Sequence, residues 1–184
     1  SSDLKNTDVL VIGSSAAGLV AALTGKRVYP DKKFTVIRKE EKTLIPCGIP
    51  YTFSSVNGTD ENILPSDQMF ENSEVDLIVN EVISIDREKR ICRLKNNDEY
   101  KYEKLVLATG STPTVPSWLK GAELENVFTA PKDKNYLDLM NQKLSNCNKV
   151  IIVGAGFIGV ELSDELKKAG KEIILIEKLP HVLG

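Results

Sequence analysis

Two segments of this chain share one pattern, in which a short apolar strand runs into a glycine-containing turn and then into a helix. They cover residues 9–18 (VLVIGSSAAG) and 150–159 (VIIVGAGFIG). In such βαβ openings the diphosphate of a dinucleotide rests on N–H groups at the N-terminus of the helix. The pattern therefore predicts an α/β protein with parallel strands and two dinucleotide sites.

The apolar periodicity and the turn residues predict the elements around these two openings. Up to residue 110 we expect helices over 16–28, 47–56 and 62–72, and strands over 8–12, 34–37, 74–85, 90–94, 99–103 and 105–110. The strands from 74 to 103 are predicted to be antiparallel. Pro65 is expected at the first position of the third helix.

The rest of the chain predicts a linker and the start of a second unit. A linker over 111–121 contains Pro113, Pro116 and Gly121, and we then expect helices over 132–145 and 157–169 and strands over 150–153 and 173–177, with Gly170 just past the last helix. One βαβ unit cannot cover both faces of its own sheet. We therefore expect domains over 1–114 and 147–184, joined by 115–146, with the second incomplete.

Composition excludes several classes of function. The net charge of −2 argues against nucleic-acid or anionic-membrane partners, and there is no apolar run of roughly 18 residues, the length of a membrane span. Residues 1–6 are polar and lack the apolar segment of a signal peptide. A single histidine and three widely spaced cysteines argue against a metal site or a disulfide framework. A cytoplasmic location is expected.

The second glycine motif fits GxGxxG in full, with Gly154, Gly156 and Gly159. Glu177 stands at the end of the next predicted strand, where a carboxylate accepts the ribose hydroxyls of NAD and repels the phosphate of NADP. Lys178 follows directly, so NADPH remains open. The alternative is a turn that only closes a strand–helix corner.

The first motif departs from this pattern and reads GxSxxG, with Ser15 in place of the middle glycine. Arg38 occupies the position of the ribose-binding acid, and Glu40 and Glu41 lie close enough to substitute for it. A purely structural role for this turn remains an alternative.

Cys47 is the candidate redox residue. It precedes Gly48 at the predicted start of a short helix, where N–H groups stabilise a thiolate, and Gly48 leaves space for a flat group. The alternative is a buried, inert cysteine. Lys26 and Arg27 end the first helix, where cations are favourable in any case.

With these residues in hand, the chain resembles the FAD-dependent pyridine nucleotide–disulfide oxidoreductases, within them the branch with a single redox cysteine. Four blocks carry the resemblance over essentially the whole chain: residues 13–18, 47–51 (CGIPY), 107–113 (LATGSTP) and 154–161 (GAGFIGVE). The resemblance implies a Rossmann-like three-layer FAD/NAD(P)-binding fold with a small antiparallel β meander, followed by the opening βαβ of a second such domain. It implies a flavoprotein that is a homodimer at full length.

The resemblance also implies roles for individual residues. Cys47 would be the redox-active thiolate under the flavin, and Phe157 an aromatic gate for nicotinamide. The expected cofactor contacts are Gly13, Ser15, Ala16, Ala17, Gly18, Arg38, Val82, Ala108, Thr109 and Gly110 for FAD, and Gly154, Gly156, Phe157, Gly159, Glu161 and Glu177 for NADH or NADPH.

Several residues of this chain differ from those usual in parts of this branch, and the differences favour one of the branch's activities. Peroxidases and many oxidases have a histidine where this chain has Ala16, and they usually lack the proline matched by Pro50. Arg27 matches an arginine that meets coenzyme A phosphates, and Thr43 matches a serine before the cysteine motif; both are expected at the substrate. We therefore expect electrons to pass from NAD(P)H through FAD and Cys47 to a disulfide or polysulfide, as in coenzyme A disulfide reductase. The alternatives are an NADH oxidase that reduces O₂ and a non-catalytic nucleotide-binding fragment.

Overall fold

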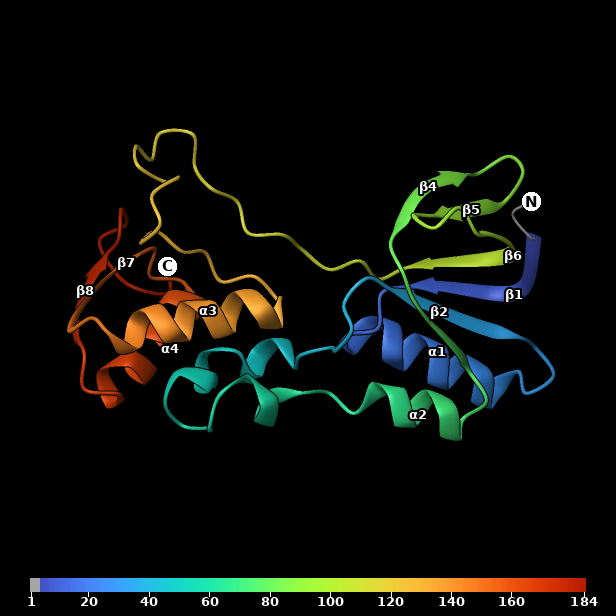
Figure 1. Ribbon diagram of the computed structural model, residues 1–184, viewed down its shortest axis with the longest axis horizontal. Helices are drawn as coiled ribbons and strands as arrows, with labels where there is room; N and C mark the ends of the chain where they lie inside the picture. The colour runs from blue at the N-terminus through green and yellow to red at the C-terminus, as the bar shows by residue number, and fades with distance from the viewer. Residues whose placement is uncertain (1–3) are drawn as a thin grey trace. The chain divides into compact units, whose positions relative to one another are not determined.

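A computed structural model describes residues 4–184, and the first three residues of the polar N-terminal segment lie outside the described residues. The chain forms two compact units, one of residues 4–43 with 64–111 and the other of 44–63 with 112–184 (Figure 1). The cysteine segment 44–63, which the sequence assigns to the first domain, packs with the second unit. Each unit is described by itself below.

The first unit is built on a six-stranded sheet in the order β3-β2-β1-β6-β5-β4. Its strands are β1 (Leu4–Ile12), β2 (Phe34–Arg38), β3 (Asp76–Val79), β4 (Val82–Asp86), β5 (Ile91–Leu94) and β6 (Glu99–Leu107). Strands β3, β2, β1 and β6 run parallel, whereas β4, β5 and β6 form an antiparallel meander. The helices α1 (Ala16–Val28) and α2 (Ser66–Asn72) lie along one face of the parallel strands (Figure 1).

The bounds expected for the strands between residues 74 and 110 were wrong in two places. In both, the bounds depend on pairing with segments that are distant in the chain. The strand expected over 74–85 is divided, because β3 pairs with β2 while β4 pairs with β5. At the break, the N–H of Asn80 donates to the carbonyl oxygen of Arg38 at 2.7 Å. The strands expected over 99–103 and 105–110 are instead the single strand β6, which pairs with β1 along its length.

The alternation of strand residues divides the apolar core of the first unit between two faces. Leu10 and Ile37 pack with Leu94 and Tyr100 beneath the meander, and Val11 and Val36 face the helices. The helix-side cluster is completed by Leu19, Ala22, Phe34, Phe70 and Val75. Gly25 of α1 leaves no room for a Cβ beside the Phe34 ring, so α1 approaches the sheet closely.

The second unit contains a two-stranded parallel sheet, two α-helices and three short 3₁₀ turns. These elements are η1 (Pro46–Gly48), η2 (Pro50–Phe53), η3 (Thr59–Asn62), α3 (Lys134–Ser145), β7 (Lys149–Val153), α4 (Phe157–Lys168) and β8 (Glu172–Ile176). The helix expected over 47–56 is replaced by η1 and η2, because Pro50 has no N–H to donate to the carbonyl of Pro46 one α-turn earlier. In the first unit, the helix expected from residue 62 is α2, which begins at Ser66, so Pro65 is its N-cap rather than its first residue.

Leucines of α3 and α4 pack against the cysteine segment and form the core of this unit. The cluster contains Leu44, Ile49, Phe53, Leu137, Met140, Leu144, Leu162 and Leu166. The end of α4 confirms the expected role of Gly170, whose φ is +83°. Its N–H donates to the carbonyl of Lys167, and that of Lys171 donates to Leu166, which is the Schellman arrangement. None of the described helices is long and apolar enough to cross a membrane.

Candidate functional site

The first glycine turn joins β1 to α1 through contacts that exclude any Cβ. Gly13 has a φ of +106°, and a Cβ there would overlap the carbonyl oxygen of Ala108. A Cβ on Gly18 would overlap the carbonyl of Gly13 itself. These two glycines therefore bring the start of α1 directly onto the end of β1, where its N–H groups face the space beyond the strands.

Ser15 is the N-cap of α1, and its side chain makes no capping hydrogen bond. Its Oγ is buried and is the one buried side-chain polar atom of the described residues that has no partner. The N–H groups of the first helical turn, starting at Ala16 and Ala17, also have no acceptor within the helix. An unpaired hydroxyl beside free N–H groups at the positive end of a helix fits a diphosphate.

The end of β6 lies beside this turn. The N–H of Ala108 donates to the carbonyl of Ile12 at 2.8 Å, and Thr109 and Gly110 follow, with Gly110 at a φ of +71°. The structure therefore brings Ala108 next to Gly13. Val82 opens β4 opposite Leu94.

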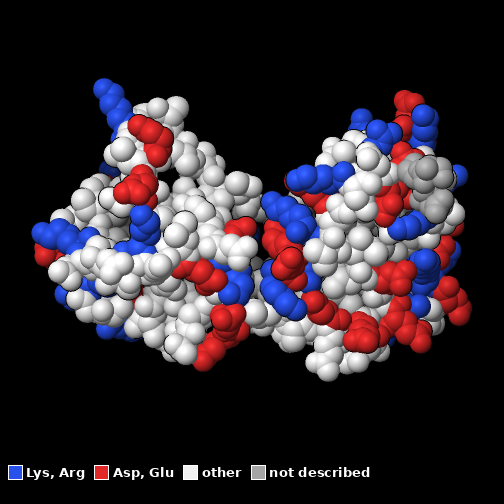
Figure 2. All heavy atoms as spheres, viewed as in Figure 1, with Lys and Arg blue, Asp and Glu red and all other residues white. Residues whose placement is uncertain are grey.

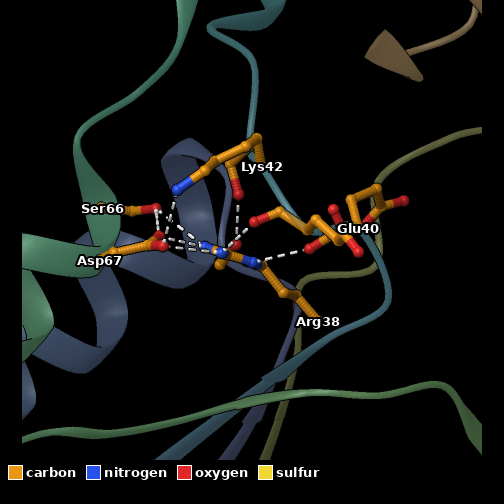
Figure 3. A network of polar contacts seen from close by, with 8 residues as sticks. Arg38, Glu40, Lys42, Ser66 and Asp67 are labelled. Atoms are coloured by element: carbon orange, nitrogen blue, oxygen red, sulfur yellow. Dashed lines mark hydrogen bonds and ion pairs between the residues drawn. The ribbon is translucent and has the colours of Figure 1, made fainter. Parts of the chain in front are cut away.

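Arg38, at the end of β2, is buried, with 1% of its side chain exposed. Its guanidinium makes a two-pronged ion pair with Asp67, with N–O distances of 2.5 and 3.0 Å (Figure 3). Nη1 also donates to Ser66 Oγ, and Nε and Nη2 donate to the carbonyl oxygens of Glu40 and Glu41. These five bonds match the five N–H donors of arginine, so every donor already has an acceptor within the chain.

The Arg38 cluster therefore holds the loop after β2 against the start of α2. The guanidinium lowers the pKa of the Asp67 carboxyl below its usual range, chiefly by hydrogen bonding. Direct contact of Arg38 with a cofactor stays a prediction. Its observed partners give it a structural role, with Glu40 and Glu41 bound through their carbonyl groups rather than their carboxylates.

Thr43 lies just before the cysteine segment, and only 8% of it is exposed. Its hydroxyl is 2.6 Å from the hydroxyl of Ser14 in the first glycine turn. Within the first unit, the pair ties the end of the loop after β2 to the glycine turn. Thr43 thus already has a partner at the position expected for substrate contact.

The second glycine turn repeats the geometry of the first. Gly154 has a φ of +103°, and a Cβ on Gly159 would overlap the carbonyl oxygen of Gly154. Gly156 is the N-cap of α4 and has open space around it. Phe157 is 75% exposed at the start of the helix.

Glu177 follows β8 and accepts three backbone hydrogen bonds. The N–H groups come from Ala155 in the glycine turn, at 2.7 Å, and from Lys178 and Leu179. The bonds from Leu179, Ala155 and Lys178 lower the pKa of this carboxyl. The acid is therefore ionised at neutral pH and held at the turn.

The sequence did not indicate the role of Glu165, one turn beyond the half-buried Glu161 on α4. Its carboxylate is 1% exposed and accepts bonds from the N–H and the hydroxyl of Ser55 at 2.8 and 2.9 Å. Burial raises its pKa, but the bonds from Ser55 and Lys168 outweigh this and bring the pKa below the usual value. The only signal in the sequence was the position of Glu165 between Leu162 and Leu166, on the core-facing stripe of α4, where a carboxylate is unusual.

Cys47 lies in η1 and is exposed, whereas Cys92 is buried and Cys147 is half-buried. Burial raises the pKa of Cys92 to about 11, which leaves its thiol protonated at neutral pH. The Cys147 thiol donates to the carbonyl of Leu144. Cys47 is therefore the accessible thiol of this chain. The space expected beside Gly48 is taken by the side chain of Asn62.

A depression of about 560 Å³ lies in the first unit at the end of α1. Its lining includes Lys26, Arg27, Asn72 and Glu74. Lys26 donates to the carbonyls of Pro30 and Lys32, whereas the side chain of the exposed Arg27 has no hydrogen bond or ion pair within residues 4–184. Arg27 is thus available to an anion.

The chain belongs to the pyridine nucleotide-disulphide oxidoreductase family, whose model matches residues 7–184. An NADH oxidase of Methanocaldococcus jannaschii is 32% identical over 95% of this chain and 41% of the relative. An NAD(P)H coenzyme A polysulfide/persulfide reductase of Pyrococcus horikoshii is 33% identical over 95% and 40%.

Similar solved structures include an NAD-dependent persulfide reductase from A. fulgidus, with 29% identity and a TM-score of 0.85. The likeness covers 97% of this chain and 35% of that one. This chain spans about two fifths of the length of the curated relatives named above. The Rossmann-like α/β fold expected from the two glycine motifs is confirmed.

We predict that Arg38→Met lowers the free energy of unfolding of the first unit by about 2 kcal/mol, because Ser66 and the carbonyls of Glu40 and Glu41 lose their donor. Arg93→Met is the matched control, since Arg93 pairs with Glu99 at 3.1 Å on the surface and should contribute less than about 1 kcal/mol. Urea unfolding followed by circular dichroism measures both. Equal losses in the two variants would contradict the structural role of Arg38.

Proposed function

We propose that the protein containing this chain is a flavoprotein oxidoreductase that passes electrons from NAD(P)H, through FAD and Cys47, to a disulfide or polysulfide. The observation that carries the proposal is the accessible Cys47 in a chain with two intact glycine turns. Relatives named for coenzyme A polysulfide/persulfide or sulfur reduction support this substrate class.

The first glycine turn is the proposed FAD site. The N–H groups at Ala16, Ala17 and Gly18 and the unpaired Ser15 hydroxyl would hold the diphosphate. Gly13, Ala108, Thr109 and Gly110 would line it through backbone, and Val82 is proposed beside the adenine. FAD, when bound, supplies the transfer of two electrons from a reduced nicotinamide to a disulfide.

The second turn is the proposed NAD(P)H site, with Gly154, Gly156 and Gly159 around the diphosphate and Phe157 as the mobile ring. The ionised Glu177 supports NADH, because its carboxylate accepts ribose hydroxyls and repels an added phosphate. Glu161 is proposed as a further contact on the same helix.

The step performed by this chain's own side chain is thiol–disulfide exchange. The Cys47 thiolate attacks one sulfur of the substrate, a Cys47–sulfur bond forms, and the substrate S–S bond breaks, releasing the other sulfur as a thiolate. Two electrons and a proton then reduce the mixed disulfide, which frees the second thiol and restores Cys47. Arg27 and Thr43 are proposed as substrate contacts, Arg27 through coenzyme A phosphates.

A relative named NADH oxidase keeps O₂ reduction as the second candidate. In that reaction Cys47 would cycle through sulfenic acid. Ala16 supports the first candidate, because this chain lacks at that position the histidine that the resemblance associates with sulfenic acid.

We also propose a cytoplasmic homodimer at full length, without nucleic-acid partners. On the face shown in Figure 2, charges of both signs alternate over the unit that carries β1–β6.

Ser15→Ala should weaken FAD binding about tenfold to a hundredfold, because it removes a hydrogen bond to a charged phosphate. It should not lower the stability of the free chain, since the hydroxyl has no partner there. FAD titration by calorimetry and thermal unfolding measure the two effects. Ser163→Ala is the control, since the Ser163 hydroxyl bonds to the carbonyl of Gly159. Unchanged FAD affinity in Ser15→Ala would contradict the proposed contact.

Incubation of the reduced chain with coenzyme A disulfide should give one mixed disulfide at Cys47, because Cys47 is its exposed thiol. Intact mass with peptide mapping measures the adduct and an absorbance assay the released thiol. Cys47→Ser should give neither product, and Cys147→Ser should behave like the parent chain. An adduct that persists in Cys47→Ser would overturn the assignment.

Arg27→Met should slow this adduct formation about tenfold, because a charge-assisted bond to phosphate is lost. The reaction with cystine, which lacks phosphate, should be unchanged. Arg87→Met, a charge loss on the exposed turn after β4, controls for net charge. Equal slowing by both variants would assign the effect to net charge rather than to a contact at Arg27.

A further inference from the structure

We propose that Asn62 is the positioning residue for Cys47, and that residue 48 is glycine because the Asn62 amide occupies the place of its side chain. The proposal rests on the proposed role of Cys47 as the attacking thiolate. It concerns residues of the second unit only, and nothing in the sequence motifs pointed to Asn62.

Asn62 binds both backbone groups of Ile45, two residues before Cys47. The N–H of Ile45 donates to the Asn62 main-chain carbonyl at 3.0 Å, and the Asn62 side-chain Nδ2 donates to the Ile45 carbonyl at 3.0 Å. The side of the turn that precedes Cys47 is thereby held at two points by one residue. Asn62 is only 5% exposed, so these bonds are protected from water.

Asn62 also contacts the residue after Cys47. A Cβ on Gly48 would overlap Oδ1 of the Asn62 amide, and the Gly48 N–H donates to the same Ile45 carbonyl at 3.0 Å. The Asn62 side chain therefore contacts this turn on both sides of Cys47, at Ile45 and at Gly48. The Cys47 thiol itself has no hydrogen bond within residues 4–184, so its direction depends on this backbone.

Asn62 is in turn anchored to α3. Thr59, at the start of η3, donates a hydrogen bond to the carboxylate of Asp138. Lys134 of α3 pairs with Asp60 at 3.0 Å and with Asp138 at 2.8 Å. The η3 turn is thus fastened to a regular helix, and Asn62 at its end is a fixed support rather than a loop residue.

The Asn62 contacts matter for the reaction because they set the direction in which the Cys47 thiolate points. Attack on a disulfide requires the thiolate to approach one sulfur from behind the bond that breaks, and misplacement of a reacting atom by an ångström is costly. Loss of the Asn62 contacts should therefore slow disulfide exchange at Cys47. General loosening of the fold would do the opposite, because it would expose all three thiols.

The test is a double-mutant cycle of Asn62→Ala and Gly48→Ala, with dipyridyl disulfide as the probe. We expect each single variant to slow the reaction of Cys47 on the order of tenfold. In the Asn62→Ala background, Gly48→Ala should have no further effect, because the added methyl group then has space. Peptide mapping assigns each modified thiol, so Cys92 and Cys147 report loosening in the same molecule.

Asn141→Ala is the matched control, since Asn141 also donates to a backbone carbonyl of this unit, that of Thr52. It should leave the rate at Cys47 unchanged. An unchanged rate in Asn62→Ala, or the same effect of Gly48→Ala in both backgrounds, would overturn the proposal. Faster modification of all three cysteines would do so too. A parent chain that reacts with dipyridyl disulfide but not with coenzyme A disulfide would count against the proposed substrate alone.

Discussion

Both glycine turns depend on one steric constraint, the contact between a glycine early in the helix and the carbonyl of the glycine that opens the turn. Gly18 meets Gly13 in this way, and Gly159 meets Gly154. The contact lets the helix start directly at the end of the strand, so its free N–H groups gather at one point. In the proposed function, the diphosphate is held by these N–H groups rather than by a charged side chain.

The charged residues at the end of the second strand of each unit make opposite kinds of contact. Glu177 is an anion that accepts N–H groups from its own glycine turn and the following residues. Arg38 is a cation that donates to two loop carbonyls and to the start of α2. The first unit thus has, at the usual place of the ribose acid, a buried cluster whose donors are all used.

The cysteine segment belongs structurally with the helices of the second unit. Ser55 bonds to Glu165 on α4, Thr59 to Asp138 on α3, and Thr52 to Asn141. Leucines of α3 and α4 fill the space beneath it. The helix that begins at the second glycine turn therefore shares one packed core with the turn that carries Cys47.

Local pattern was enough to predict the glycine turns, the helices α1, α3 and α4, and the candidate thiol, because these depend on residues close together in the chain. It was insufficient where partners are distant. The division of the strand expected over 74–85 depends on pairing with β2 and β5, and Glu165 lies 110 residues from Ser55.

The sequence by itself determined the family, the two glycine turns and the candidate cysteine, since short motifs with strict steric requirements encode them. Only the tertiary structure decided what holds these groups in place. Arg38, Glu165 and Asn62 act through backbone and side-chain partners that no periodicity identifies, because a hydrogen bond between distant segments exists only once the chain has packed.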